Sequence, residues 1–315
     1  MAKPAILVSE VGPRDGLQMA KSIMPTEAKK RWIKAAFEAG VREIEVCSFV
    51  PPKLVPAMAD AGEVTRFAAT LEGLTVAVLA PNAKGAEAAI AAGAHKITVP
   101  ISVSATHNKA NVNRTPAESV EEIARICALR DGVPADRRPV VEGGLSTVFG
   151  CTMEGEVPER NVLALSTALV KAGVDEVGLA DTTGMANPHS IKRIFKAVRA
   201  EIGAEKLSGA HLHNTYGLGL ANALAALEVD VTTLDSSLAG LGGCPFAPGA
   251  SGNIVTEDLV YMLHQMGLST GIDLEGVIAT RAILAEAMPA ELLYGFVAEM
   301  GATRGGRSME KVAAL

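Results

Sequence analysis

The chain has 315 residues, of which 49% are hydrophobic and 20% charged, and its formal net charge is -6 at pH 7. This length suits one α/β barrel of about 250 residues with extensions, so we expect one domain. The acidic balance argues against nucleic acid and anionic membrane surfaces as partners, and a small anionic substrate would need a local basic site.

The sequence begins MAKPAILVSEV, which enters an apolar strand-like run almost at once. We therefore expect no signal or transit peptide, and no apolar stretch reaches the roughly 18 residues of a membrane span. Cys47, Cys127, Cys151 and Cys244 form no CxxC pair, which is typical of small buried side chains in a reducing compartment. A cytoplasmic protein is expected.

Three segments repeat one pattern: an Ala-rich helix end, a glycine and a β-branched run. They read FEAGVREIEV, IAAGAHKITV and LVKAGVDEVGL, and LAALEVDVTTLD is a degenerate copy. Gly40, Gly93 and Gly173 stand where a helix C-terminus favours a residue that tolerates positive φ. The pattern predicts a helix, a short turn and a buried strand, which is half of a βα unit.

Eight apolar strand-like runs alternate with helical patterns along the chain. This alternation predicts an α/β protein with a (β/α)8 TIM barrel, although a doubly wound open sheet has the same local pattern. The runs lie near residues 6 to 10, 42 to 48, 74 to 80, 95 to 102, 138 to 146, 174 to 180, 208 to 213 and 230 to 236.

Polar side chains at the strand ends favour the barrel over the open sheet. They are Glu10 followed by Asp15, Glu45 with Ser48, Asn82, Ser102 with Ser104, Ser146, Asp181, His211 with His213, and Asp235. Barrel enzymes gather their catalytic groups at the C-terminal strand ends, where all eight strands meet at one mouth. An open sheet would scatter these side chains.

We expect a single domain over residues 1 to 315. The barrel occupies about residues 5 to 270, and extra C-terminal helices occupy about 271 to 300. Helical patterns there run from 274 to 287 and from 289 to 300. A loosely held tail is expected over about 301 to 315.

Three strand-end residues predict a metal site. Residues two apart in a strand point to the same side, so His211 and His213 face the barrel mouth together. Asp15 follows the first strand after Arg14 and reaches the same mouth. Two imidazoles, a carboxylate and water suit a six-coordinate Mg²⁺ or Mn²⁺, and Zn, Co and Fe accept the same ligand types.

The segment LGGCPFAPGASGNIVTEDLVYML supplies two further candidates after the last strand. Asn253 offers an amide oxygen to the metal, or else caps the following helix, a role for which Thr256 competes. Cys244 lies on a loop rich in glycine and proline. Its thiol is either a proton carrier over the site or a structural side chain.

At this point the motifs EVGPRDGLQ, IEVCSFVPPKLVPAMADA, HLHNTYGLGLAN and AGLGGCPFAPGASGNIVTEDLVYML together resemble the hydroxymethylglutaryl-CoA lyase family over roughly residues 6 to 285. The resemblance implies a carbon-carbon lyase that uses Mg²⁺ or Mn²⁺ to cleave 3-hydroxy-3-methylglutaryl-CoA to acetyl-CoA and acetoacetate, a step of leucine catabolism. A cytoplasmic homodimer that binds an acyl-CoA is the expected form.

The resemblance also implies roles for individual residues. Metal ligands are expected at Asp15, His211, His213 and Asn253, enolate stabilisation at Arg14, and a catalytic loop at Cys244. Glu45 and Asp181 are expected to act in catalysis, and either His211 or Asp181 moves the hydroxyl proton. Substrate contacts are expected at Gln18, Lys21, Ser48 and Ser104, with Glu10 and Glu257 supporting the site.

Two segments depart from the family pattern. Ala105 stands where family members often carry Glu, and STVFGCTMEGEV, with Thr152, replaces a CPYEG-like phrase. These changes affect the acyl pocket, so a lyase of citramalyl-CoA is an alternative. A condensing synthase or an aldolase of the same superfamily is a second one, and a non-catalytic binding barrel is a third. The Cys244 loop argues for the lyase.

Overall fold

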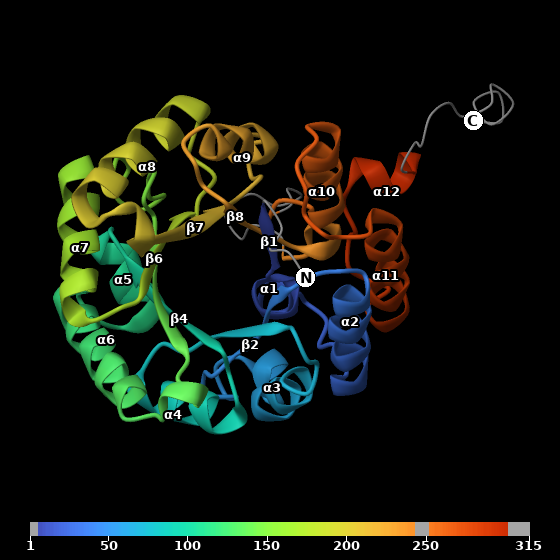
Figure 1. The fold of residues 1–315 in the computed structure, drawn as a ribbon, viewed down its shortest axis with the longest axis horizontal. Coiled ribbons are helices and arrows are strands. Elements are labelled where there is room, and N and C mark those ends of the chain that lie inside the picture. Colours follow the sequence, from blue (N-terminus) through green and yellow to red (C-terminus); the bar gives the residue numbers. More distant parts are fainter. Residues whose placement is uncertain (1–5, 243–251, 302–315) are drawn as a thin grey trace, which may run out of the picture.

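Eight parallel strands close into a barrel in the computed structural model, which describes residues 6–242 and 252–301 (Figure 1). Each strand pairs with the next and β8 pairs with β1, so the sheet has no open edge. The strands are β1 Leu7–Glu10, β2 Glu43–Ser48, β3 Thr75–Leu79, β4 Lys96–Ser102, β5 Val140–Ser146, β6 Glu176–Asp181, β7 Leu207–Leu212 and β8 Thr233–Ser236. The predicted TIM barrel is confirmed, and the largest boundary difference is at β8, which begins at residue 233 rather than 230.

Helices follow the strands and surround the barrel (Figure 1). They are α1 Leu17–Met19, α2 Thr26–Glu38, α3 Ala61–Ala68, α4 Ala83–Ala92, α5 Ala105–Val112, α6 Pro116–Asp131, α7 Glu159–Ala172, α8 Pro188–Ile202, α9 Gly219–Leu227, α10 Thr256–Gln265, α11 Leu274–Ala287 and α12 Phe296–Met300. None of the helices within the described ranges is both long and apolar enough to cross a membrane.

The turns between helices and strands have the backbone that the repeated sequence pattern predicts. Gly40, Gly93 and Gly173 have φ values of 99°, 89° and 100°. In the degenerate copy Asp230 occupies this position with φ 61°. The left-handed conformation is therefore kept even where the glycine is absent, because Asp tolerates it better than most residues.

The C-terminal helices agree with the sequence only in part. α11 has the predicted bounds, but the helix expected over 289 to 300 begins only at Phe296. Gly295 has φ 124°, which a helix cannot continue through. The Asp258 side chain of α10 then accepts the backbone N–H groups of Phe296 and Val297 and starts α12. Residues 302 to 315, most of the expected tail, lie outside the described ranges.

Strand β5 shows how the barrel separates two environments. Val141 and Leu145, which face the helices, are fully buried, whereas Glu142, Gly144 and Ser146 alternate with them and stay partly accessible. The apolar core therefore lies between strands and helices, and the barrel interior is polar. Cys47, Cys127 and Cys151 are buried free thiols, as the sequence predicts.

Candidate metal centre and active site

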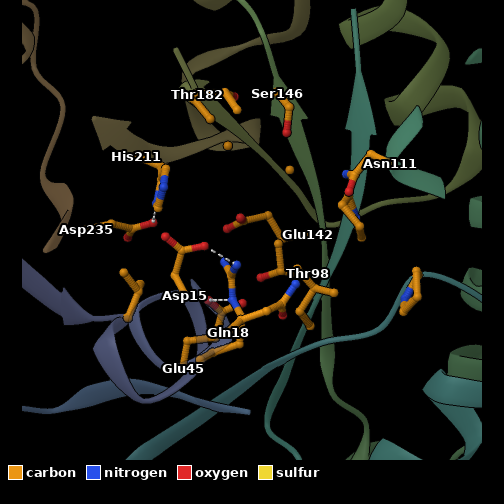
Figure 2. A pocket seen from close by; sticks show the side chains of 18 of the residues that line it. Asp15, Gln18, Glu45, Thr98, Asn111, Glu142, Ser146, Thr182, His211 and Asp235 are labelled. Carbon is orange, nitrogen blue, oxygen red and sulfur yellow. Dashed lines mark hydrogen bonds and ion pairs between the residues drawn. The ribbon is translucent and has the colours of Figure 1, made fainter. Parts of the chain in front are cut away.

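A cavity of about 790 Å³ occupies the barrel interior and its mouth (Figure 2). Its lining runs from the C-terminal strand ends, at Ser146 and His211, down to the first residues of β2 and β4, Glu43 and Lys96. Figure 2 shows Asp15, His211 and Asp235 at one side, with Glu142 and Thr98 facing the same space. The C-terminal face is where barrel enzymes hold their substrates.

A π-helical turn over Gly12–Gly16, just after β1, places Arg14 and Asp15 in this cavity. A side chain on Gly12 would meet Glu10 Oε1 at 2.5 Å and the Trp32 ring at 2.8 Å, so the close turn needs glycine there. Arg14 forms an ion pair with Asp15, and its Nε donates to Glu45 Oε2 at 2.5 Å.

A bulge in β7 turns the histidines inward. The β6–β7 register shifts between Val177 and Leu179, and Ser208 and Gly209 lie opposite this shift. Ser208 and His211 therefore both line the cavity although they are three residues apart. Bulges commonly re-aim side chains in this way near active sites.

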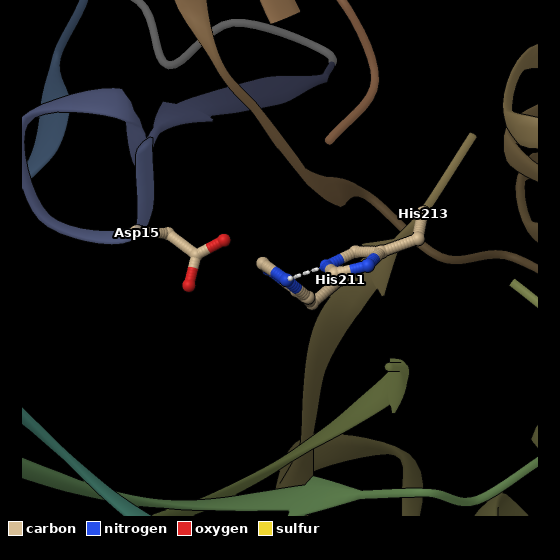
Figure 3. Close-up of side chains that lie close together, drawn as sticks. All are labelled: Asp15, His211 and His213. Atoms are coloured by element: carbon tan, nitrogen blue, oxygen red, sulfur yellow. Dashed lines mark hydrogen bonds between the residues drawn. The ribbon is translucent and has the colours of Figure 1, made fainter. Parts of the chain in front are cut away.

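Asp15, His211 and His213 bring their ligand atoms within 4.8 Å of one another (Figure 3). The Nε2 atoms of the two imidazoles are 3.0 Å apart. His211 Nδ1 is 3.0 Å from Asp235 Oδ2, which fixes the ring and leaves Nε2 for the cluster. The sequence names Asp235 only as a strand end, because its pairing with His211 depends on the β7–β8 neighbourhood.

Asn253 joins this group from the segment after β8. Its backbone forms an isolated antiparallel β-bridge with that of His213. Its side-chain Nδ2 lies 2.7 Å from Asp15 Oδ2. Turning the amide by half a rotation would present its oxygen instead. Asn253 does not cap α10, which begins three residues later at Thr256 after Val255.

The charge states of Asp15 and His213 suit a cation, whereas the pKa of His211 is raised because Asp235 and Asp15 outweigh the effect of burial. Burial alone would raise the pKa of Asp15, but Arg14 and the imidazoles outweigh it and the pKa is lowered. Burial, and then the neighbouring His211, lowers the pKa of His213 to about 4. One ligand is therefore an anion and another a neutral imidazole at neutral pH, which are the forms that bind metal.

The outer nitrogen of the His213 ring is unsatisfied. The Nδ1 atom of His213 is buried without a hydrogen-bond partner among the described residues, although Nε2 faces the cluster. The imidazole is thus held by packing and by the cluster, not by an outer hydrogen bond. Residues Asp15, His211, His213 and Asn253 fit a divalent ion by donor type and by convergence.

Glu45 is a buried carboxylate in the cavity wall whose pKa is raised. Burial raises its pKa to about 7, although Arg14 acts to lower it. Its Oε2 accepts from Arg14, while its Oε1 has no partner within the described residues. Beside it Ser48 Oγ donates to Gln18 Oε1 at 3.1 Å, so these two predicted contacts lie together.

Asp181, for which a catalytic role is expected, is buried at the end of β6. In β6 it has the same alternation as buried Val177 and Leu179, and it does not line the cavity. One oxygen accepts from the Ala186 backbone N–H at 3.1 Å. Burial raises its pKa to about 6. The side chain shapes the loop after β6.

Other predicted residues surround the cavity without lining it. The Glu10 carboxylate accepts from the backbone N–H groups of Gly12 and Leu238. The Glu257 carboxylate accepts from the Ala239 N–H and forms an ion pair with Arg281. Both carboxylates therefore hold the loops around the mouth in place. Ser104 caps α5, and Lys21 is exposed. Cys244 lies outside the described ranges.

Sequence reasoning missed the charged groups inside the barrel. Lys96 Nζ lies 2.6 Å from Glu142, 3.1 Å from Glu176 and 3.9 Å from Glu43. The period-two alternation of side chains in β4 and β5 is the signal that places Lys96 and Glu142 inward. In the sequence, however, these two segments look like ordinary strands with scattered polar residues.

The chain matches the HMGL-like family over residues 5–284. It is 42% identical to mitochondrial hydroxymethylglutaryl-CoA lyase of Gallus gallus, over 90% of this chain and 93% of that protein. Hydroxymethylglutaryl-CoA lyase YngG of Bacillus subtilis (strain 168) is 40% identical, with the same two coverages.

A solved HMG-CoA lyase from Acinetobacter baumannii, in complex with coenzyme A and 3-methylmalate, has a TM-score of 0.89 and 40% identity, covering 96% of this chain and 97% of that one. The family match and these identities extend across the barrel and the candidate site. The chain therefore belongs to the hydroxymethylglutaryl-CoA lyase-like family, as the resemblance of its motifs predicts.

Proposed function

We propose that this protein is a divalent-metal-dependent lyase that cleaves 3-hydroxy-3-methylglutaryl-CoA to acetyl-CoA and acetoacetate. The observation that carries this proposal is the convergence of Asp15, His211 and His213 beside Arg14 at the mouth of a cavity. It occurs in a chain about 40% identical to hydroxymethylglutaryl-CoA lyases.

The reaction develops negative charge at two places, the C3 oxygen and the thioester oxygen. The C3 hydroxyl loses its proton, the C2–C3 bond breaks, and C3 becomes the ketone of acetoacetate. The electron pair of the broken bond moves into the thioester as an enolate, which then takes up a proton to give acetyl-CoA. A divalent ion held by Asp15, His211, His213 and Asn253 would orient the substrate oxygens and lower the pKa of the hydroxyl.

Arg14 is placed to stabilise the enolate. Burial alone would lower its pKa, but Glu45 and Asp15 outweigh this effect and raise it, so the guanidinium stays charged in the cavity. Its two carboxylate partners fix its orientation before substrate arrives. A preorganised cation facing a developing oxyanion stabilises the transition state more than the ground state.

The proton steps need a group that lines the cavity. Of the two candidates His211 and Asp181, only His211 does so, and Asp235 holds its Nδ1. Because a His211 that holds the metal through Nε2 cannot itself take the proton, we propose that the hydroxyl proton leaves on the side of the His211–Asp235 pair, both members of which line the cavity, and we assign a supporting role to Asp181. Cys244 is kept as the proposed donor of the second proton.

The metal is proposed from the set of donor atoms, and the substrate class, oligomeric state and compartment are proposed from family membership. Carboxylate and amide oxygens beside two imidazoles favour Mg²⁺ or Mn²⁺. An acyl-CoA is proposed as the substrate because the Acinetobacter baumannii relative was solved with coenzyme A. A cytoplasmic homodimer acting in leucine catabolism is proposed from the resemblance.

A product assay tests the function. Chelator-treated protein is incubated with HMG-CoA or citramalyl-CoA, with Mg²⁺, Mn²⁺ or no metal. We expect equal amounts of acetyl-CoA and acetoacetate from HMG-CoA, only with metal, and little from His213→Ala. Pyruvate and acetyl-CoA from citramalyl-CoA alone would support the alternative substrate. No cleavage of either ester under any metal would reject the lyase.

A further inference from the structure

The two segments that depart from the family pattern lie against each other in the fold. Glu154, in the loop after β5, accepts a hydrogen bond at 2.6 Å from the backbone N–H of Thr106. Thr106 follows Ala105, which is the first residue of α5. Neither Ala105 nor Glu154 lines the cavity. Any effect that these two positions have on the cavity must therefore pass through α5.

A tight turn fixes the position of Glu154. Cys151 and Gly155 form an isolated antiparallel bridge, with backbone hydrogen bonds of 2.9 Å and 2.7 Å. The Cys151 side chain is buried, and its sulfur accepts from the Met153 N–H at 3.4 Å. Gly155 closes the turn with a φ of 78°. The loop after β5 therefore holds the backbone of Glu154 still, and the carboxylate is aimed at α5.

Two side chains from different segments satisfy the first turn of α5. Ser104 Oγ accepts from the His107 N–H at 3.1 Å, and Glu154 accepts from the Thr106 N–H. The first N–H groups of a helix have no partner within the helix, and a carboxylate beside them also interacts favourably with the helix dipole. The pKa of Glu154 is lowered, mainly by its hydrogen bonds with Thr106, so it is an anion here at neutral pH.

Helix α5 forms one wall of the cavity at its mouth. His107 and Asn111 line the cavity, and Figure 2 shows Asn111 on the side away from His211. His107 Nδ1 lies 2.7 Å from Ser102 Oγ at the end of β4, so the place of this imidazole depends on how the first turn of α5 is held. An acyl-CoA whose thioester lies near the metal cluster leaves the barrel through the mouth that α5 borders.

We propose that Glu154 is a positioning residue for acyl-CoA binding. It supplies from the loop after β5 the carboxylate that family members often carry on α5 at position 105, and it thereby fixes the α5 wall. The two departures then form a compensating pair, in which the carboxylate has moved from the helix to the loop. The inference rests on the proposed function. Because Glu154 does not line the cavity, it affects substrate binding and not the bond cleavage at the metal.

Kinetics and calorimetry on the Mg²⁺-loaded protein test the proposal. We expect Glu154→Ala to raise KM for HMG-CoA and Kd for coenzyme A about fivefold, which corresponds to the loss of one typical helix cap. The value of kcat should change less than about twofold, and metal affinity should be unchanged. Glu156→Ala, at an exposed position of the same loop, is the matched control and should match the wild type. Unchanged KM and Kd, or a fall in kcat at constant KM, would overturn the proposal.

A second substitution separates a positioning role from a general loss of stability. Ala105→Glu places a carboxylate on the first residue of α5, so the double variant with Glu154→Ala should recover the wild-type Kd for coenzyme A within about twofold. In the wild-type background Ala105→Glu adds a like charge near Glu154 and should not tighten binding. If Ala105→Glu fails to restore binding in the double variant, the compensating pair is rejected.

Hydrogen exchange locates the effect in the fold. The amide protons of Thr106 and His107 should exchange faster in Glu154→Ala and return to the wild-type rate in the double variant with Ala105→Glu. The amides of α4 should not change in either. Wild-type exchange rates for Thr106 and His107 in Glu154→Ala would mean that Ser104 alone holds the start of α5, which would overturn the proposal.

The outcomes separate this inference from the proposed function. Failure to cleave HMG-CoA with any metal would reject the proposed function, whereas the Kd for coenzyme A and the hydrogen exchange would still decide the role of Glu154. Normal cleavage of HMG-CoA by Glu154→Ala, with the wild-type KM, would overturn the inference alone and leave the lyase intact.

Discussion

Arg14 and Asp15 are neighbours in the chain, and we propose that each interacts with a group whose charge is opposite to its own. Asp15 offers one oxygen to Arg14 and the other to the side of Asn253 and the histidines. Arg14 uses Nε on Glu45, so its position does not depend on Asp15 alone. The pair therefore places, within one helical turn, the cation proposed to stabilise the enolate and the anion proposed to bind the metal.

Replacing Arg14 separates these two tasks. We expect Arg14→Gln to lower kcat about 10²- to 10³-fold, since a preorganised charge at a developing oxyanion contributes this much in other enzymes. Metal affinity, measured by calorimetry, should change much less, because the ligand set is intact. Arg31→Gln, at an exposed ion pair with Glu286, is the control and should match the wild type. Equal losses of turnover and metal affinity would contradict the assigned role.

Asp235 would position a proposed metal ligand, because its carboxylate is paired with His211 Nδ1. We expect Asp235→Asn to weaken metal binding about 10- to 100-fold, because the His211 ring loses the anion that fixes its orientation and raises its basicity. Calorimetric titration with Mn²⁺ measures the change. Asp230→Asn, on the exposed turn before β8, provides a matched control. Unchanged affinity in Asp235→Asn would show that packing alone orients His211.

At the scale of elements, Glu10 connects the segments that surround the mouth. Its Oε1 accepts from the Gly12 turn after β1 and from Leu238 after β8, both at 2.9 Å. Its Oε2 accepts from Thr256 at the start of α10 at 2.7 Å, and Thr256 also reaches Ser236. One buried carboxyl group therefore holds three loops that position Arg14, Asp15 and Asn253.

The charge of Glu10 should make this connection depend on pH. Burial raises its pKa from 4.5 to about 8. The folded state thus binds the proton more tightly than the unfolded state, and the resulting stability is present below about pH 4.5 and is lost as pH rises through 8. Glu10→Gln keeps a comparable hydrogen-bond pattern without the titration.

Denaturant unfolding at pH 5 and pH 9 tests this. We expect the wild type to lose a few kcal/mol relative to Glu10→Gln between these two values, at about 1.4 kcal/mol per pKa unit. Glu87→Gln, at an exposed position of α4, should show no such change. A difference between wild type and Glu10→Gln that is the same at both pH values would mean that Glu10 does not titrate in this range.

The elements themselves follow from sequence more closely than the directions of their side chains. Hydrophobic period and glycine turns place all the strands, because both signals are local. Asp181 is expected in the site, but its carboxylate accepts from the backbone of the loop after β6, and a bulge in β7 decides which residues face inward. Bulges and strand-end bends depend on the neighbouring strands. The inward charges of Lys96 and Glu142 are likewise visible only once the strands are paired.

At the scale of the molecule, the proposed metal ligands come from both ends of the barrel sequence. Asp15 follows β1, His211 and His213 end β7, and Asn253 precedes α10. Since β1 pairs with β8, these segments are neighbours at the point where the barrel closes. A bound ion would therefore link the first βα unit with the last two strands of the barrel.

This arrangement predicts that the ion stabilises the whole fold. A ligand that binds only the folded state adds about 2.7 kcal/mol at a concentration 100 times its Kd, so saturating Mg²⁺ or Mn²⁺ should raise Tm by several degrees and a chelator should reverse the shift. Differential scanning calorimetry measures it. His213→Ala should abolish the shift, whereas His189→Ala, at the exposed start of α8, should retain it. A metal-dependent Tm that persists in His213→Ala would place the ion elsewhere, because loss of one imidazole from this cluster removes a ligand that neither Asp15 nor Asn253 replaces.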